Sequence, residues 1–189
     1  MLIAVDVAIL PPRRVSELAI ELSASLPKAE AQGLLLGPDY LPHLTLLQLF
    51  VSPDDLNAYL DRVGEVVAAY PAMRLRVTGG AVGGHTVWME IERTPALVQF
   101  HSRLLDASLP FERPGGDTTA FLDGDARDRD VGWVAGYRAT SSGASFRPHI
   151  TLGHATHPPV IEPIEFEATT VAACHLGRFC SCRRVLRAW

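Results

Sequence analysis

A five-residue phrase that holds one histidine and one threonine occurs twice in the sequence. Residues 42–46 read Pro-His-Leu-Thr-Leu, and residues 148–152 read Pro-His-Ile-Thr-Leu. In an extended strand, residues i and i+2 point to the same face. The phrase therefore predicts that His43 projects beside Thr45, and His149 beside Thr151. Two such strands that meet would place two imidazoles and two hydroxyls around one small anion, an arrangement that can hydrolyse a phosphodiester without a metal ion.

The chemistry of these residue types is that of acid–base catalysis. Cleavage of a phosphodiester by water needs a base for the attacking oxygen and an acid for the leaving oxygen, and each proton transfer contributes about 10²–10⁴-fold. Histidine serves either role near neutral pH, and threonine hydroxyls can donate to phosphoryl oxygens. We therefore predict His43, Thr45, His149 and Thr151 as catalytic residues, with a bell-shaped pH profile. The pattern leaves open which histidine is the acid.

The elements that must position these residues follow from apolar periodicity. Alternating or continuous apolar runs predict strands, and helical spacing predicts a helix after Pro12, one capped by Ser52, and one around residues 97–105. A polar loop is expected over 113–132. The predicted strands cover residues 2–10, 41–51, 74–82, 86–92, 136–139 (weak) and 146–155, and a C-terminal hairpin covers 166–175 and 180–189, turning at Gly177-Arg178. Each half of the chain holds one motif, which predicts a single two-lobed domain over residues 1–189 with a pseudo-repeat.

Composition narrows the classes of function. The chain has 189 residues, is 48% hydrophobic and carries a formal net charge of −4. This charge argues against binding of nucleic acid by bulk electrostatics, but it is compatible with a small or end-bound nucleotide. The N-terminus lacks the basic region of a signal peptide, and no apolar run reaches membrane-spanning length. Three cysteines fit a reducing compartment, so a cytoplasmic location is expected.

The paired motifs resemble the 2H phosphoesterase superfamily. Within it, the chain is most similar to bacterial 2′-5′ RNA ligase-like and cyclic phosphodiesterase proteins. The resemblance implies an α+β, bilobal fold in which two antiparallel-rich sheets line a central cleft, with helices on the outside. It also implies metal-independent chemistry, without a cofactor, on 2′,3′-cyclic phosphates or 2′-5′ linked nucleotide or RNA ends. By resemblance, His43 is the expected acid and His149 the expected base.

Two other functions remain open at this point. The same fold could bind RNA ends or nucleotides without turnover, or catalyse reversible 2′-5′ RNA ligation; the intact histidines and threonines of both motifs favour an enzyme. A metal-dependent hydrolase is the second alternative. We expect a nucleotide or RNA substrate, a monomer, no obligate protein partner and no membrane association.

Residues outside the motifs must determine the substrate specificity. Many relatives place a basic residue after the second motif, where this chain has Gly153-His154. Arg147 shares strand parity with His149 and could supply the positive charge for substrate binding. Trp88 could stack on a base, although packing in the protein is the alternative.

Three further groups of residues could be functional but are better explained by structure. His101 lies on the apolar face of a predicted helix and is expected in the core, and His85 in a turn. The acidic stretch 123–130 lacks the ligand order of an EF-hand and predicts a solvated, mobile loop. Cys174-His175 and Cys180-x-Cys182 do not have the spacing of a zinc site, so buried cysteines and no metal site are predicted.

Overall fold

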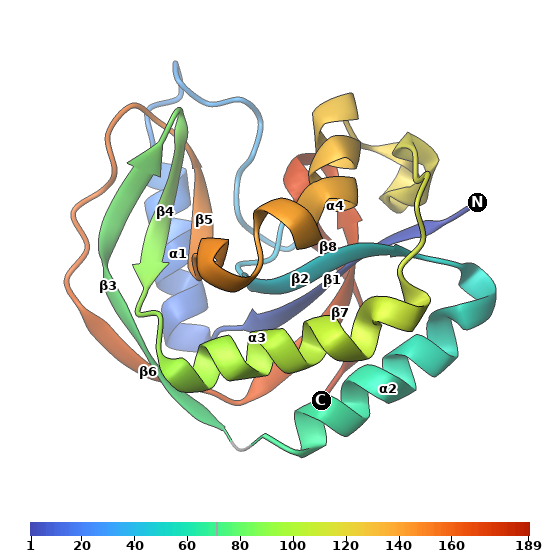
Figure 1. The fold of residues 1–189 in the computed structure, drawn as a ribbon. Helices are drawn as coiled ribbons and strands as arrows, with labels where there is room; N and C mark the ends of the chain where they lie inside the picture. The colour runs from blue at the N-terminus through green and yellow to red at the C-terminus, as the bar shows by residue number, and fades with distance from the viewer. Residues whose placement is uncertain (71) are drawn as a thin grey trace.

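The computed structural model describes residues 1–70 and 72–189, which form eight strands and four α-helices (Figure 1). The strands are β1 (Ile3–Leu10), β2 (Leu44–Val51), β3 (Met73–Gly83), β4 (Thr86–Ile91), β5 (His149–His154), β6 (Ile164–Ala168), β7 (Thr170–Gly177) and β8 (Ser181–Ala188). The helices are α1 (Arg13–Ser25), α2 (Leu56–Ala68), α3 (Pro95–Ser108) and α4 (Asp128–Thr140). The strands pair antiparallel in the order β6-β3-β4-β5-β2-β1-β7-β8, which confirms the α+β class.

The sheet consists of two four-stranded halves that meet at the motif strands. Strands β2 and β5 are joined at one residue pair, Leu44 with Ile150, whereas neighbouring strands within each half pair over five to seven residues. The prediction of two separate sheets is not confirmed, because this pair makes the sheet continuous. Counted outward from β2 and β5, the halves correspond strand for strand, in agreement with the predicted pseudo-repeat.

Helices cover both halves of the sheet. Helix α1 lies against β5, and α3 lies against β2 and beside α2 (Figure 1). The main core lies between these helices and the sheet, with Tyr59 of α2 and Phe100 of α3 buried in it. Helix α4 contacts the opposite face of β2, where Phe50 and Val134 belong to a second apolar cluster.

The helices begin where the sequence provides caps. The hydroxyl of Ser52 accepts a hydrogen bond from the backbone N–H of Asp54 ahead of α2, and that of Thr94 accepts one from Leu97 at the start of α3. Such caps satisfy N–H groups that have no partner within the helix. No helix of the described ranges has the length and apolar character needed to span a membrane.

Helix α4 occupies residues for which the sequence predicted the end of a loop and a weak strand, so that prediction is wrong. Two residues of the helix, Gly132 and Gly136, disfavour helical structure by about 1 kcal/mol each relative to alanine. The buried residues form a narrow stripe: Asp130, Val134 and Tyr137. Packing of this stripe against β2 therefore determines the helix, and local propensity does not reveal it.

The sequence also predicts residues 166–168 as the start of the C-terminal hairpin, and this prediction is wrong. These residues pair with β3 instead, and two arginines of β3 lie opposite two glutamates of β6: Arg74–Glu167 and Arg76–Glu165. Opposite charges on facing residues stabilise strand pairing. The hairpin proper is β7–β8, and its predicted turn after Gly177 is confirmed.

Candidate active site

The single pair between β2 and β5 brings the two motifs together. Leu44 and Ile150 are antiparallel partners, and both are buried in the main core. Side chains alternate along a strand, so the residues on either side of this pair point to the opposite face. Continuing the antiparallel register makes the motif residues neighbours in two pairs: His43 with Thr151, and Thr45 with His149. His43 itself lies one residue before β2, which begins later than predicted.

Both motif strands carry a bulge directly after the threonine. The extra residue is Leu46 in β2 and Leu152 in β5. A bulge shifts the alternation of side chains by one residue. Gln48 and His154, three positions after each threonine, therefore lie on the same face as the motif side chains. The pseudo-repeat thus extends beyond the two five-residue phrases.

The two histidines are held in the same way. Nδ1 of His43 lies 2.6 Å from the carbonyl oxygen of Leu41, and Nδ1 of His149 lies 2.7 Å from that of Arg147. A carbonyl only accepts, so each Nδ1 carries a hydrogen and donates it. Each Nε2 is therefore the atom that gains or loses a proton. Both imidazoles are fixed in the tautomer that acid–base catalysis at Nε2 requires.

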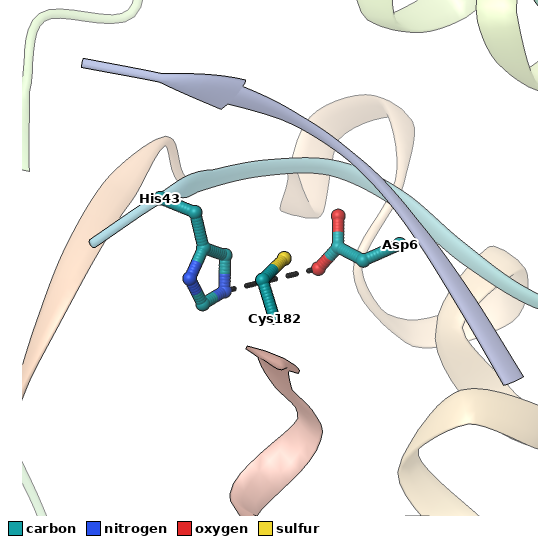
Figure 2. Close-up of side chains that lie close together, drawn as sticks. All are labelled: Asp6, His43 and Cys182. Carbon is teal, nitrogen blue, oxygen red and sulfur yellow. Dashed lines mark ion pairs between the residues drawn. The ribbon is translucent and has the colours of Figure 1, made fainter. Parts of the chain in front are cut away.

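A buried carboxylate lies beside the first motif. We call His43 and Thr45 the first half-site, and His149 and Thr151 the second. Asp6 of β1 is fully buried, and its Oδ2 accepts hydrogen bonds from Thr45 Oγ1 and Gln48 Nε2, both at 2.7 Å. His43 Nε2 lies 3.9 Å from the same oxygen (Figure 2). This distance is too long for a hydrogen bond, so Nε2 is not committed to Asp6.

Burial shifts the protonation of both half-sites. Burial raises the pKa of Asp6 above its usual value, against the opposing effects of His43 and the hydrogen bonds from Gln48 and Thr45. Burial also lowers the pKa of His149, which the hydrogen bond to Arg147 opposes and the nearby His43 reinforces. Both burial and the nearby His43 therefore favour the neutral form of His149.

The motif pattern did not predict Asp6 or Gln48. Asp6 interrupts an otherwise apolar strand, and Gln48 is its direct partner in the ladder between β1 and β2. Buried acidic residues are rare unless they are paired. A single acidic residue at the centre of an apolar strand was the available signal.

Trp88 and Arg147, the predicted substrate-binding residues, both lie at the second half-site. Trp88 is the ladder partner of Thr151, and its ring centroid lies 5.4 Å from that of His149. Its ring also covers Gly83, where a Cβ would lie 2.8 Å from the indole. Arg147 is exposed and precedes the strand. Their contact with substrate stays a prediction.

His101 links the two motif segments from helix α3 and is fully buried, as predicted. Its Nδ1 lies 2.6 Å from the carbonyl oxygen of the bulge residue Leu46. Its ring stacks on Phe146, which precedes the second motif, with centroids 3.9 Å apart and planes 6° from parallel. His85 lies in the exposed turn between β3 and β4, also as predicted.

Asp6, His43 and Cys182 could offer one ligand atom each to a metal ion, because these atoms lie within 4.8 Å of one another (Figure 2). Zinc accepts this donor set. However, Asp6 Oδ2 already accepts two hydrogen bonds, and burial raises the pKa of the Cys182 thiol, which opposes the thiolate that a metal needs. Both observations argue against a metal ion at these three residues, and the absence of a metal site stays a prediction.

The other predicted groups have structural roles. Cys174 and Cys182 are buried and Cys180 is partly buried, all as free thiols. In the acidic stretch, the prediction of a wholly solvated loop is wrong at Asp130, which is buried and forms an ion pair with Arg127. Asp125 pairs with Arg183.

Two cavities lie away from the motif residues. One of about 350 Å³ lies between α4 and the segment 109–115, and one of about 90 Å³ lies beside Tyr70 and Phe100. Neither is lined by His43 or His149, so the predicted central cleft stays a prediction.

Solved structures share this architecture over the full chain. E. coli LigT complexed with 3′-AMP matches with a TM-score of 0.65 and 20% identity, over 100% of this chain and 98% of that chain. LigT complexed with ATP gives 0.65 and 19% over the same shares. TT0787 of Thermus thermophilus gives 0.59 and 18%, over 99% of this chain and 97% of that one. At these identities the likeness shows the fold alone. No curated protein matches the sequence.

The family follows from the sequence itself. The model of the 2′-5′ RNA ligase superfamily matches residues 28–179, a range that contains both His-x-Thr motifs and the strands β2 to β5. Its match agrees with the paired histidines, the repeated bulges and the shared fold. The chain belongs to the 2′-5′ RNA ligase superfamily, the 2H phosphoesterase family that its two motifs resemble.

Proposed function

We propose that this protein is a metal-independent phosphodiesterase that opens 2′,3′-cyclic phosphates or cleaves 2′-5′ linked nucleotide or RNA ends. The observation that carries the proposal is the matched anchoring of His43 and His149. Each imidazole donates from Nδ1 to a carbonyl two residues earlier, so each presents Nε2 for proton transfer. Two such groups on adjacent strands supply an acid and a base without a metal.

The lowered pKa of His149 favours it as the base. In its neutral form, Nε2 of His149 takes a proton from water as the water oxygen attacks phosphorus. His43, in its protonated form, gives the Nε2 proton to the ribose oxygen that leaves. The P–O bond to the ribose breaks, a P–O bond to water forms, and the pair regains its starting state when a proton passes from His149 to His43 through solvent. Thr45 and Thr151 donate to the non-bridging oxygens.

A nucleotide substrate is supported by the relatives and by the second half-site. LigT structures contain 3′-AMP and ATP, and Trp88 beside His149 offers an aromatic surface on which a base can stack. The net charge of −4 favours a small or end-bound substrate over a long nucleic acid. Exposed Arg147 is suited to a phosphate or ribose group outside the reacting centre.

The experiment is a substrate panel with product identification. Purified protein is incubated with the four 2′,3′-cyclic nucleotides, cyclic-phosphate-ended RNA and 2′-5′ linked dinucleotides, with and without EDTA. Turnover that EDTA leaves unchanged supports the proposal, and the position of the product phosphate reports which ester bond breaks. Turnover abolished by EDTA would establish a metal-dependent enzyme instead. Nucleotide binding with no turnover on any substrate would identify a binding module of the same fold.

A further inference from the structure

The surroundings of Asp6 contain more hydrogen-bond acceptors than donors. Asp6 Oδ2 receives the hydroxyl of Thr45 and the amide of Gln48. Asp6 Oδ1 and Gln48 Oε1 are both buried without a partner among the described residues. A buried polar atom without a hydrogen-bond partner destabilises the fold. A proton on Asp6 Oδ2 would add one donor to this group of acceptors and would leave Oδ1 as a neutral carbonyl oxygen, which costs less to bury than a carboxylate oxygen.

Thr45 cannot donate to an ionised Asp6 and to a phosphate at the same time. A threonine hydroxyl has one hydrogen. When Asp6 is ionised, that hydrogen is given to Asp6 Oδ2, and Thr45 presents only lone pairs to a phosphate. The phosphate would then face both these lone pairs and a buried negative charge. Thr45 can donate to a phosphate only if Asp6 releases its hydrogen.

We propose, resting on the phosphodiesterase function above, that Asp6 is a positioning residue that acts as a neutral carboxylic acid when phosphate is bound. Its O–H donates to Thr45 Oγ1, and the hydroxyl of Thr45 then donates to a phosphoryl oxygen. Gln48 Nε2 continues to donate to the carboxyl group and holds its orientation. Neutral Asp6 thus frees the hydroxyl hydrogen of Thr45 for the phosphate. Asp6 itself does not contact the substrate.

Burial favours the neutral form of Asp6 and raises its pKa, which is the largest effect on this group. The charge of His43, which lies just before β2, and the hydrogen bonds from Gln48 and Thr45 act in the opposite direction. Cys174 of β7 is its ladder partner, and burial raises the pKa of two further thiols near it, Cys182 of β8 and Cys180 of the turn before that strand. Tyr137 of α4 and Tyr59 of α2 are neutral, because burial raises the pKa of both hydroxyls and the nearby charge of Asp6 adds to this rise. A bound phosphate adds negative charge, which favours protonation further.

The second half-site shows what is particular to Asp6. Strand β1 of the first half corresponds to β4 of the second half. Asp6 is the ladder partner of Gln48, and the equivalent residue of β4 is Thr86, the ladder partner of His154. Thr151 therefore has no carboxyl group behind it at that position. The two halves of the site are equivalent in their motifs but differ in how their threonines are prepared for donation.

The test compares Asp6→Asn with Asp6→Leu, because asparagine keeps a neutral donor and a carbonyl acceptor whereas leucine keeps only volume. Turnover of 2′,3′-cyclic AMP and the Kd for inorganic phosphate are measured for both, with thermal unfolding as the check on folding. Asp6→Asn should stay close to the wild type in both measurements. Asp6→Leu should lose about 10²-fold in kcat, the effect of one missing donor, and a Thr45→Val variant should lose no more when Asp6→Leu is added.

A spectroscopic measurement reads the proton directly. The infrared difference between wild type and Asp6→Asn, recorded with saturating inorganic phosphate, should contain the C=O stretch of a protonated carboxylic acid. A carboxylate signal in its place would overturn the proposal. Equal losses in Asp6→Asn and Asp6→Leu would show that the charge is needed and would also overturn it, as would full activity in Asp6→Leu.

The proposal and the function on which it rests fail separately. If wild-type protein turns over neither cyclic phosphates nor 2′-5′ linked dinucleotides, the phosphodiesterase function fails, and the infrared signal and phosphate affinities still decide whether Asp6 is neutral in the phosphate complex. If turnover is normal and depends on His43 but Asp6 carries a charge, the function stands and the role of Asp6 is overturned.

Discussion

Replacement of His101 should loosen both motif segments at once. The bulge in β2 leaves the carbonyl of Leu46 outside the strand ladder, and His101 Nδ1 supplies its donor at 2.6 Å. The imidazole also stacks on Phe146, three residues before His149. One side chain of α3 therefore ties the end of the first motif to the start of the second. Its loss should reduce stability and turnover together.

The size of the effect follows from these contacts. His101→Ala removes a fully buried ring and leaves a cavity, for which aromatic-to-alanine changes cost about 3–5 kcal/mol. His101→Phe retains the stacking and leaves the Leu46 carbonyl without a donor, at about 1–3 kcal/mol. The phenylalanine variant recovers part of this loss, because His101 Nε2 is itself buried without a partner among the described residues.

The assay is urea unfolding followed by fluorescence, together with kcat/KM on a 2′,3′-cyclic nucleotide. The matched control is His85→Ala in the exposed turn between β3 and β4, which should change neither quantity. The expected order of stability is His85→Ala, then His101→Phe, then His101→Ala. A His101→Ala protein as stable and as active as His85→Ala would refute the link between the two motif segments.

Three further predictions follow from the site and its burial. Because burial lowers the pKa of His149, the acid limb of the kcat/KM profile should lie below pH 6.5; a limb at or above that value would contradict His149 as the base. Trp88→Ala should raise KM by about tenfold through lost stacking, while Trp88→Phe should retain most of the affinity; equal KM values would exclude a base at this position. Burial also lowers the pKa of His101 and His154, so the unfolded chain binds protons that the folded chain does not. Stability should therefore be full above pH 6.5 and decline as pH falls below it, and urea unfolding with no decline would contradict this.

The meeting of the two motifs in the fold could be predicted from the sequence, because each motif is a local pattern. Each motif joins an imidazole and a hydroxyl at strand parity, and a proline before each histidine marks where the strand begins. The strands β1 to β5 follow from apolar alternation, and the start of α2 follows from Ser52. These features depend on neighbours within a few residues, so periodicity and capping rules reveal them.

The features that were not predicted depend on partners distant in the chain. Helix α4 contains two glycines and depends on its contact with β2, and β6 pairs with β3, a strand far earlier in the chain. Asp6 becomes part of the site only because β1 pairs with β2 and a bulge turns both Thr45 and Gln48 toward it. No local pattern contains that information.

The central claim is that His43 and His149 act as one acid–base pair, and a double-mutant cycle tests it most directly. The kcat/KM for a 2′,3′-cyclic nucleotide is measured for His43→Ala, His149→Ala and the double variant. Each single variant should lose about 10²–10⁴-fold, and the double variant should lose little more than either, because an acid without its base contributes little. Turnover that survives in the double variant at the wild-type level would contradict the claim.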